Sequence, residues 1–284
     1  MLCSLWYVIF GLFGLSFGSF LNVLIDRLPK REKITGHSYC PHCKKRLLWY
    51  ELIPLLSFFL LKGKCSSCKK PISLQYPVVE LTTGILFPLT IYNYNSQITL
   101  IRQGFGGQTT CNLQNLLILS FLLLIVCCLI VIFVSDLKYY IVPDEIIYSA
   151  IFFAFCYQIV SNLRSPISNI SNLLSSLRFP FLSAIGAVIF FLVILLVTKG
   201  KGMGLGDVKI AAFMGLFLSF PNVLVALFLA FLAGSIVGII LIIFRKKTLK
   251  SKIPLAVFLS PATYIIFFWG QKIIERYLSI FKYY

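Results

Sequence analysis

Acidic residues are scarce in this sequence. Its 284 residues include only nine Asp and Glu against 26 Lys and Arg, and all charged residues together make up 12% of the chain. Hydrophobic residues make up 59%. A soluble domain of this length does not need so much apolar surface, so the composition excludes an ordinary soluble protein and predicts a membrane protein. In such a protein a carboxylate at a membrane helix is costly, and each one is therefore a functional candidate.

Long apolar segments recur along the whole chain. Windows of about 17 to 22 nearly uncharged residues match the length that crosses roughly 30 Å of hydrocarbon. A further window, 208–220, is shorter and would be marginal alone. The first window lacks the basic start and cleavage site of a signal peptide, so we expect it to be retained. These windows predict an all-α polytopic membrane protein with about eight transmembrane helices. The longer windows are 4–25, 77–95, 115–135, 145–161, 180–198, 223–244 and 254–271.

Lys and Arg are distributed unevenly between alternate loops. If the N-terminus lies outside, the inner loops with Lys209 just beyond them hold 20 of the 26 basic residues. This asymmetry follows the positive-inside rule and predicts both termini on the non-cytoplasmic side. The net charge of +17 is then mostly a topology signal, and no nucleic-acid partner is expected. The inner loops are 26–76, 136–144, 199–207 and 245–252.

Two aspartates fall at one predicted depth, near the cytoplasmic face. Asp136 ends the third apolar window, and Asp207 begins the short one. Two carboxylates a few ångström apart share one proton, so one can activate a water while the other polarises a scissile carbonyl. Gly204 and Gly206 would allow close approach of substrate and strained dihedrals. The structural alternative makes Asp207 a helix N-cap and Asp136 an interfacial charge.

Two other charged residues lie near the same face. Asp144 follows Pro143 and is either a third acid of the site or the start of the fourth helix. Lys209 either favours ionisation of Asp207 or marks the interface by snorkelling. Both interpretations remain open for each residue.

Glu80 lies inside the second predicted helix instead of at its edge. Asn22 and Ser19, with Gly18, form a small polar stripe on the first helix near the same membrane face. Glu80 facing this stripe either lines a site for the substrate or a methyl donor or belongs to a structural hydrogen-bond network.

The inner segment 26–76 contains two Cys-x-x-Cys pairs separated by 21 residues. This spacing matches a four-cysteine tetrahedral zinc site, whose role would be structural because protein fills all four positions. Disulfides are the alternative, and a reducing cytoplasm disfavours them. With four thiols available, neither His37 nor His42 is needed as a ligand. The expected Zn²⁺ ligands are Cys40, Cys43, Cys65 and Cys68, whereas Cys3, Cys111, Cys127, Cys128 and Cys156 lie in or beside apolar helices and are expected to pack there.

Five motifs follow one another along the chain. They are Gly18-Ser19-Phe20-Leu21-Asn22-Val23 with Arg27-Leu28-Pro29, the two cysteine pairs, Ile53-Pro54-Leu55-Leu56-Ser57 with Ile72-Ser73, Tyr76-Pro77 and Glu80-Leu81, Asp136 to Asp144, and Gly204-Leu205-Gly206-Asp207. In this order the motifs resemble the type IV prepilin peptidases, a family of GxGD-type membrane aspartic proteases, over nearly the whole chain. A lone Gly-x-Gly-Asp also fits the presenilin-like proteases, but those predict a Pro-Ala-Leu motif near the end and no cysteine loop. This chain has Ile253-Pro254-Leu255-Ala256 and the full cysteine loop.

The resemblance implies an aspartic endopeptidase of the bacterial cytoplasmic (inner) membrane, with Asp136 and Asp207 as the catalytic pair. Its partners would be type IV prepilins and pilin-like precursors of type II secretion or competence, cut after a glycine at the cytoplasmic face. Many family members also methylate the new N-terminal residue with S-adenosylmethionine. No Gly-rich loop follows a strand here, so a Rossmann-type site is excluded and the residues that bind this cofactor are unassigned.

Other functions remain open beside this one. They are a peptidase without methyltransferase activity, a non-enzymatic membrane scaffold for pilus or secretion assembly, and an ion or proton carrier. The carrier is disfavoured because both acids lie at one face. The expected regions are a first transmembrane helix at 1–25, a cytoplasmic zinc-binding domain with four cysteines at 26–76 and a transmembrane aspartic peptidase domain at 77–284.

Overall fold

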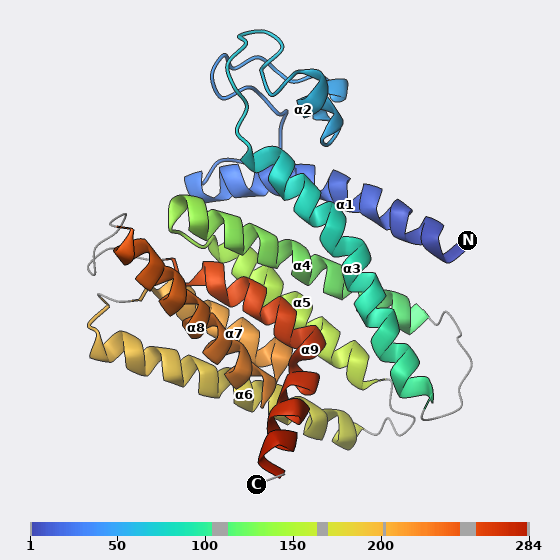
Figure 1. The fold of residues 1–284 in the computed structure, drawn as a ribbon, viewed down its shortest axis with the longest axis vertical. Helices are drawn as coiled ribbons and strands as arrows, with labels where there is room; N and C mark the ends of the chain where they lie inside the picture. The colour runs from blue at the N-terminus through green and yellow to red at the C-terminus, as the bar shows by residue number, and fades with distance from the viewer. Residues whose placement is uncertain (1, 104–112, 164–169, 201–202, 245–253, 283–284) are drawn as a thin grey trace. The chain divides into compact units, whose positions relative to one another are not determined.

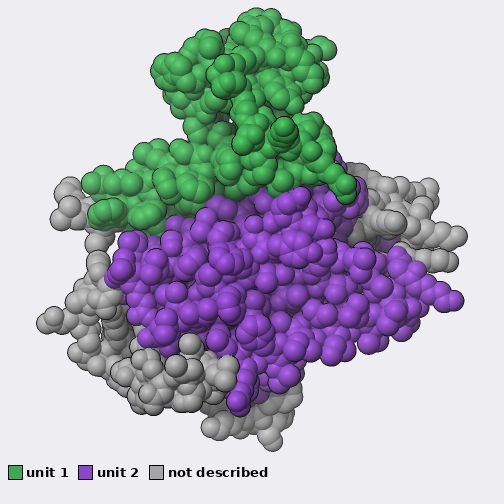
Figure 2. Space-filling model, turned by 180° about the vertical axis from the view of Figure 1, so that it is seen from behind, with its two compact units in different colours: residues 1–110 green, residues 111–284 purple. Residues whose placement is uncertain are grey.

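The structure is a computed structural model that describes residues 2–103, 113–163, 170–200, 203–244 and 254–282 (Figure 1). The chain divides into two compact units, residues 1–110 and residues 111–284, which are coloured green and purple in Figure 2. Across the described ranges the chain is helical, with two isolated β-bridges and no β-strand. The predicted all-α fold is therefore confirmed.

The first unit is built on two long antiparallel helices, α1 (Leu2–Arg27) and α3 (Gln75–Gln103). A Cβ added to Gly18 of α1 would lie 2.6 Å from the Glu80 Cα of α3, and Gly14 approaches α3 as closely. Small residues allow membrane helices to approach in this way, and the gain comes from van der Waals packing because lipid tails are as apolar as the side chains. The glycines of the first-helix motif are therefore the contact surface for α3.

Polar groups join the same two helices near the end of α1. The Asn22 side-chain amide donates to the Tyr76 carbonyl oxygen at 3.1 Å, and the Tyr76 hydroxyl donates to the Asp26 carboxylate at 2.7 Å. Asn22 is only 2% exposed. A buried amide is costly unless it is hydrogen-bonded, so this contact fixes how the two helices align.

Residues 28–74 form a small lobe, the cysteine lobe, at the end of this helix pair (Figure 1). Arg27 holds the beginning of the lobe, because its guanidinium donates to the carbonyl oxygens of Ile34 and His37, each at 2.9 Å. Regular structure in the lobe is limited to short elements. These are the 3-10 turns η1 (Leu28–Lys30) and η2 (Trp49–Leu52) and the helix α2 (Leu56–Leu60).

The second unit is a helix bundle with α4 and α7 at its centre. α4 is the most buried of the membrane-length helices, with 61% of its apolar window buried. It packs against α5 and α9, while α7 packs against α5, α6 and α9. The described helices of this unit are α4 (Leu113–Tyr139), α5 (Asp144–Asn162), α6 (Ile170–Val197), α7 (Leu205–Leu218), α8 (Asn222–Ile243) and α9 (Ala256–Lys282).

The helix α7 is short and ends among buried side chains. Its 14 residues span about 21 Å at 1.5 Å per residue, less than the roughly 30 Å of a hydrocarbon core. Gln158 of α5 donates its side-chain amide to the Leu216 carbonyl oxygen at 2.9 Å, near the end of α7. This bond satisfies a terminal carbonyl that the helix itself leaves unpaired.

Each predicted apolar window corresponds to one helix. Six of them, α1, α4, α5, α6, α8 and α9, are long and apolar enough within the described residues to cross a membrane. The remaining two windows are α3, which packs along α1, and the short α7. The chain is thus a multi-pass membrane protein, as the composition predicts.

Changing Gly18 to Ala should destabilise the first unit. The new Cβ would lie 2.6 Å from the Glu80 Cα, and such overpacking typically costs about 1–3 kcal/mol. Thermal unfolding in detergent should therefore have a lower midpoint than that of the unmodified protein. Gly186→Ala in α6 is the control, because nothing lies within 4 Å of a Cβ at that position. Equal midpoints for the two variants would contradict the packing argument.

Candidate active site and metal centre

Asp136 lies in the last turn of α4 and is only 6% exposed. Its carboxyl group interacts with the backbone N–H groups of Ala256 and Val257, in the first turn of α9. These N–H groups have no partner within their own helix, so they stabilise a negative charge placed beside them. The Asp136 Oδ2 and the neighbouring Ser135 Oγ are buried and make no hydrogen bond to the described residues. They are therefore available to a water or a substrate group.

Asp207 lies in the first turn of α7 and is half-buried. The helix begins after Gly204, which is its N-cap residue, and the Gly204 N–H donates to Asp207 Oδ2 at 3.2 Å. The alternative in which Asp207 is itself the N-cap is therefore wrong. Asp207 is instead the third residue of the helix, and its carboxylate lies at the helix N-terminus, where the helix dipole stabilises a negative charge.

The structure brings the two predicted acids together at one end of the second unit. The charge on Asp136 is close enough to act on Asp207. Each carboxyl group also lies at the beginning of a helix, α9 for Asp136 and α7 for Asp207. Two like charges in a partly buried site favour one shared proton, so the pair can hold one acidic and one basic oxygen together.

Gly206 lies beside the connection between α4 and α5. A Cβ added there would be 3.8 Å from the Val142 Cβ, which is an ordinary van der Waals contact. Gly204 has an extended φ of −94°, and Gly206 is helical. The expectation of strained dihedrals at these glycines is therefore wrong, because neither has a positive φ. What they provide is an uncrowded backbone beside Asp207.

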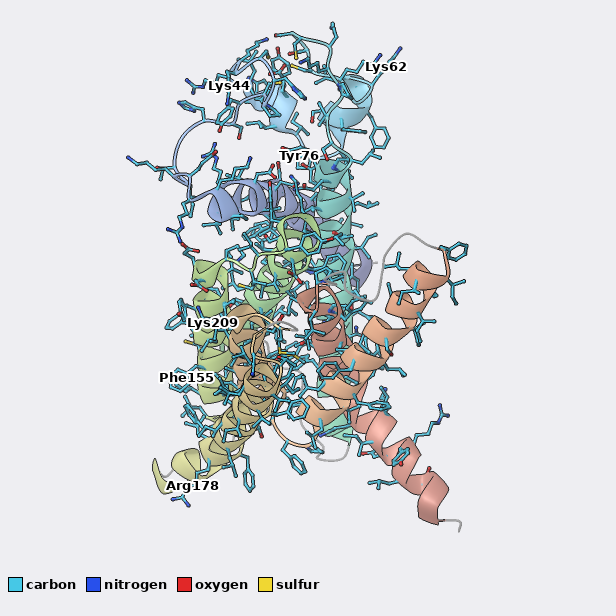
Figure 3. The ribbon with its side chains drawn as sticks, turned by 90° about the vertical axis from the view of Figure 1, so that its left-hand side faces the viewer. Lys44, Lys62, Tyr76, Phe155, Arg178 and Lys209 are labelled. Atoms are coloured by element: carbon cyan, nitrogen blue, oxygen red, sulfur yellow. The ribbon has the colours of Figure 1, made fainter. Side chains whose placement is uncertain are left out.

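Lys209 forms a salt bridge with Asp144 (Figure 3 labels Lys209). Its Nζ donates to Asp144 Oδ1 at 2.6 Å and lies 5.3 Å from the centre of the Tyr148 ring. Asp144 is the first residue of α5 and follows Pro143, as its structural interpretation predicts. Solvent-exposed pairs of this kind contribute little to stability, because water and salt screen the charges. The bridge links α5 to α7 two residues beyond Asp207.

Glu80 is buried and joins α3 to the cysteine lobe. Its Oε2 accepts a hydrogen bond from the Leu55 N–H at 2.8 Å, and the Ser19 hydroxyl of α1 bonds to the same carboxyl group. Leu55 has φ 57° and ψ −47°, and the Leu56 N–H donates to the Pro54 carbonyl oxygen at 2.6 Å. This is a γ-turn with positive φ, which is a rare and strained conformation. The described contacts of Glu80 therefore form a structural network that holds this turn on α3.

The two Cys-x-x-Cys pairs fold into two copies of one turn. In each copy the N–H of the first cysteine, Cys40 or Cys65, donates to the carbonyl oxygen five residues later, at 3.0 and 2.9 Å. The lysine after the second cysteine has a positive φ in both, 60° at Lys44 and 56° at Lys69. An antiparallel β-bridge closes each copy, between Tyr39 and Arg46 in one and between Lys64 and Pro71 in the other.

The four sulfur atoms of these turns converge on one point. Each cysteine Sγ lies within 4.8 Å of the other three. The Cys40 and Cys68 sulfurs are 3.9 Å apart, and the Cys43 and Cys65 sulfurs are 4.0 Å apart. Tetrahedral Zn–S bonds of about 2.3 Å place sulfurs about 3.8 Å apart, so the group fits such an ion. All four are free thiols, which excludes the disulfide alternative in this structure.

Two thiols of the cluster have pKa values shifted in opposite directions. Backbone N–H groups of Cys68 and Ser67 point at the Cys65 sulfur and lower the pKa of that thiol to about 6. The Lys45 N–H also lowers the pKa of Cys43, but burial and hydrogen bonds to the other three cysteines outweigh it and raise this pKa to about 11. Because Cys43 must lose its proton to bind a metal ion, metal binding at this cluster should depend on pH.

The remaining cysteine predictions divide by location. Cys127 and Cys128 are buried in α4 and Cys156 is half-buried in α5, all as free thiols. These positions agree with packing roles. The side chains of Cys3 and Cys111 lie outside the described residues, as does the inner loop 245–252.

Sequence reasoning did not anticipate three contributors to these sites. The start of α9 supplies the Ala256 and Val257 N–H groups to Asp136, and the Leu55 N–H binds Glu80. Pro254, just before α9, was the available signal, because proline is common where a helix begins. Nothing local signalled the Leu55 contact, since it joins residues 25 positions apart.

The fold and sites define a helical multi-pass membrane protein with a paired carboxylate centre and a four-cysteine lobe. Residues 12–94 match the model of the bacterial peptidase A24 N-terminal domain, and residues 123–239 match that of the type IV leader peptidase family. The chain belongs to the type IV leader peptidase family. The two matches contain the cysteine lobe and both aspartates respectively.

Curated relatives cover nearly the whole chain. A Legionella pneumophila protein named prepilin leader peptidase/N-methyltransferase is 29% identical over 301 residues, covering 96% of this chain and 94% of the relative. Proteins of the same name from Pseudomonas aeruginosa and Bacillus subtilis are each 28% identical, covering 94% and 95% of this chain and 92% and 96% of their own. No solved structure matches this chain.

Purified protein should contain about one equivalent of zinc, since four thiolates at tetrahedral spacing satisfy one Zn²⁺. Replacing Cys40 and Cys65 by Ser should remove it, as measured by elemental analysis. Cys156→Ser is the matched control and should keep the metal, because Cys156 lies in α5 outside the cluster. A folded lobe without metal in the unmodified protein would refute the site.

Gly206→Ala should reduce peptide cleavage without lowering the unfolding midpoint. The added Cβ makes only an ordinary contact with Val142, so any loss reflects obstruction beside Asp207. A steric misfit of 1 Å can cost about 10²-fold in rate. Gly215→Ala is the contrasting variant, because its Cβ would lie 2.5 Å from the Ala184 Cα and should lower stability. Unchanged cleavage by Gly206→Ala would argue against close substrate approach at this backbone.

Proposed function

We propose that this chain is a membrane-embedded aspartic endopeptidase that removes the short basic leader of type IV prepilins and pilin-like precursors. The observation that carries the proposal is the meeting of Asp136 and Asp207 at one end of the bundle, each beside the beginning of a helix. The shared name of the curated relatives supports the substrate class. The precursor would be cut after a glycine.

The acid pair supplies both groups that peptide hydrolysis needs. The ionised carboxylate accepts a proton from a water as that water attacks the scissile carbonyl, and the protonated carboxyl donates to the carbonyl oxygen. The Ala256 and Val257 N–H groups hold the Asp136 carboxyl in position. The two carboxyl groups titrate as one coupled unit, so the shared proton belongs to the pair.

The charge distribution supports placing this centre at the cytoplasmic face of the bacterial inner membrane, with both termini outside. A leader that remains in the cytoplasm could then reach the pair while its apolar segment stays in the bilayer. The regions proposed are a first transmembrane helix at 1–25, a cytoplasmic domain at 26–76 and a transmembrane peptidase domain at 77–284. Zn²⁺ would be held by the four lobe cysteines and would stabilise the fold of the lobe.

We propose N-methylation of the new N-terminal residue as the second activity, on the names of the curated relatives. S-adenosylmethionine would supply the methyl group when bound. The described residues include no strand, so a Rossmann-type site does not fit this part of the chain.

Asp136→Asn and Asp207→Asn should each abolish leader removal while the protein still accumulates in the membrane. Loss of general acid–base catalysis lowers rates by typically about 10²–10⁴-fold. The measurement is the product N-terminus, determined by mass spectrometry after incubation with a pilin-like precursor. Glu275→Gln is the matched control, an exposed acid on α9, and should cleave normally.

The same experiment separates the alternatives. Normal cleavage by either Asn variant would overturn the acid pair and favour a scaffold, for which only cysteine substitutions should be damaging. Adding S-adenosylmethionine tests the second activity. A methylated N-terminus would support it, whereas a cleaved but unmethylated product would indicate a peptidase alone.

A further inference from the structure

The cysteine lobe exposes large apolar side chains between η2 and α2. Trp49 is 77% exposed, Leu60 73% and Phe59 71%. Contiguous exposed apolar surface on a domain usually marks an interaction site, because exposing it to water is unfavourable. We call this surface the apolar face. It comprises Leu48, Trp49, Tyr50, Leu56, Phe59 and Leu60.

The apolar face is held beside the end of a long helix. Leu55, between η2 and α2, donates its N–H to Glu80 of α3 at 2.8 Å. Glu80 is five residues beyond Gln75, where α3 begins, and five residues of helix rise about 7.5 Å. This bond holds Leu55, the residue before α2, level with the second turn of α3, and Figure 1 shows α2 near the beginning of α3.

This level of α3 already carries apolar side chains on its outer surface. Val78, Leu81 and Ile85 are 55%, 48% and 55% exposed, at helical spacing on one face. α3 packs along α1, which is long and apolar enough to cross a membrane. Exposed apolar side chains on such a helix face lipid. The apolar face is thus placed where the lipid-facing surface of α3 begins.

Basic side chains surround the apolar face. Lys62 and Lys64 follow α2 and are exposed, and Lys44 and Lys62 are labelled in Figure 3. The only acid between residues 44 and 70 is Glu51, which is buried and accepts the Leu48 N–H at 2.8 Å. Between residues 44 and 70 the exposed charges of the lobe are therefore all positive. Each Lys or Arg near an anionic membrane contributes about 1 kcal/mol of attraction.

We propose that the apolar face is an anchor that inserts into the interfacial region of the anionic leaflet from which α1 and α3 emerge. Trp49 would lie at headgroup depth, as tryptophan does in membrane proteins, with Phe59 and Leu60 deeper and the lysines at the phosphates. Interfacial apolar faces typically bury about 5–10 Å into this boundary. The anchor fixes the orientation of the cysteine lobe relative to the membrane. It depends on membrane embedding alone and not on the peptidase proposal.

Tryptophan fluorescence tests the anchor directly. Trp6 and Trp269 are the other two tryptophans, so the full chain with Trp6→Phe and Trp269→Phe reports on Trp49 alone. It is reconstituted in vesicles of phosphatidylcholine and phosphatidylglycerol that contain lipids brominated at different depths. We expect quenching by shallow brominated lipids and weak quenching by aqueous acrylamide. Strong acrylamide quenching with no effect of brominated lipid would overturn the proposal.

Two variants of this single-tryptophan protein test whether the apolar face is the surface that inserts. Phe59→Ser with Leu60→Ser should weaken lipid quenching, whereas Ile34→Ser, at an exposed apolar residue outside the apolar face, should leave it unchanged. A zinc content of one equivalent shows that each lobe is folded. Equal quenching in the double variant and its parent contradicts the proposal. Lipid quenching that appears only after a prepilin is added would also contradict the proposal, because the apolar face would then be a binding site for the precursor.

Discussion

A carboxylate in a membrane protein must have its charge stabilised by the protein, and this constraint organises the second unit. In this unit the N-termini of two helices stabilise the carboxylates. The first turn of α9 faces Asp136, and the first turn of α7 contains Asp207, so unpaired N–H groups replace the water that a carboxylate loses on burial. α7 is too short to cross the whole hydrocarbon core, and Gln158 satisfies a carbonyl oxygen near its far end. The arrangement of the bundle and the chemistry proposed for it therefore have one physical origin.

The first unit answers a different requirement, which is to hold a small polar lobe at the end of a membrane helix pair. The lobe has almost no regular secondary structure, so its fold depends on the four-sulfur cluster and on hydrogen bonds to the helices. Glu80 makes one of these hydrogen bonds between a helix and the lobe. Its buried carboxylate binds a strained turn at Leu55 and thereby sets the level of the neighbouring apolar segment. A residue considered for the substrate or methyl-donor site thus acts, in its described contacts, on the position of the lobe.

Local patterns in the sequence predicted the features that depend on local chemistry. Apolar length located every long helix, because crossing hydrocarbon requires a minimum run of apolar residues. Cys-x-x-Cys spacing located the four-cysteine cluster, because both cysteines of a pair come from one turn. Pro143 correctly indicated the beginning of α5 at Asp144. Contacts between residues far apart in the chain could not be predicted in this way. Lys209 pairs with Asp144 of another helix, and the glycines before Asp207 have ordinary dihedrals, since their role concerns open space and not backbone strain.

The sequence by itself therefore determined an all-helical membrane protein and identified the two aspartates and the four cysteines as candidate site residues, because composition, apolar run length and motif spacing require no knowledge of packing. Only the tertiary structure decided what surrounds those residues. It brought the start of α9 to Asp136, placed Asp207 inside the first turn of α7 and fixed Leu55 on Glu80. The first and the third of these depend on how segments far apart in the chain approach one another, and that approach is set by packing at positions such as Gly18, where the absence of a side chain is the only local sign.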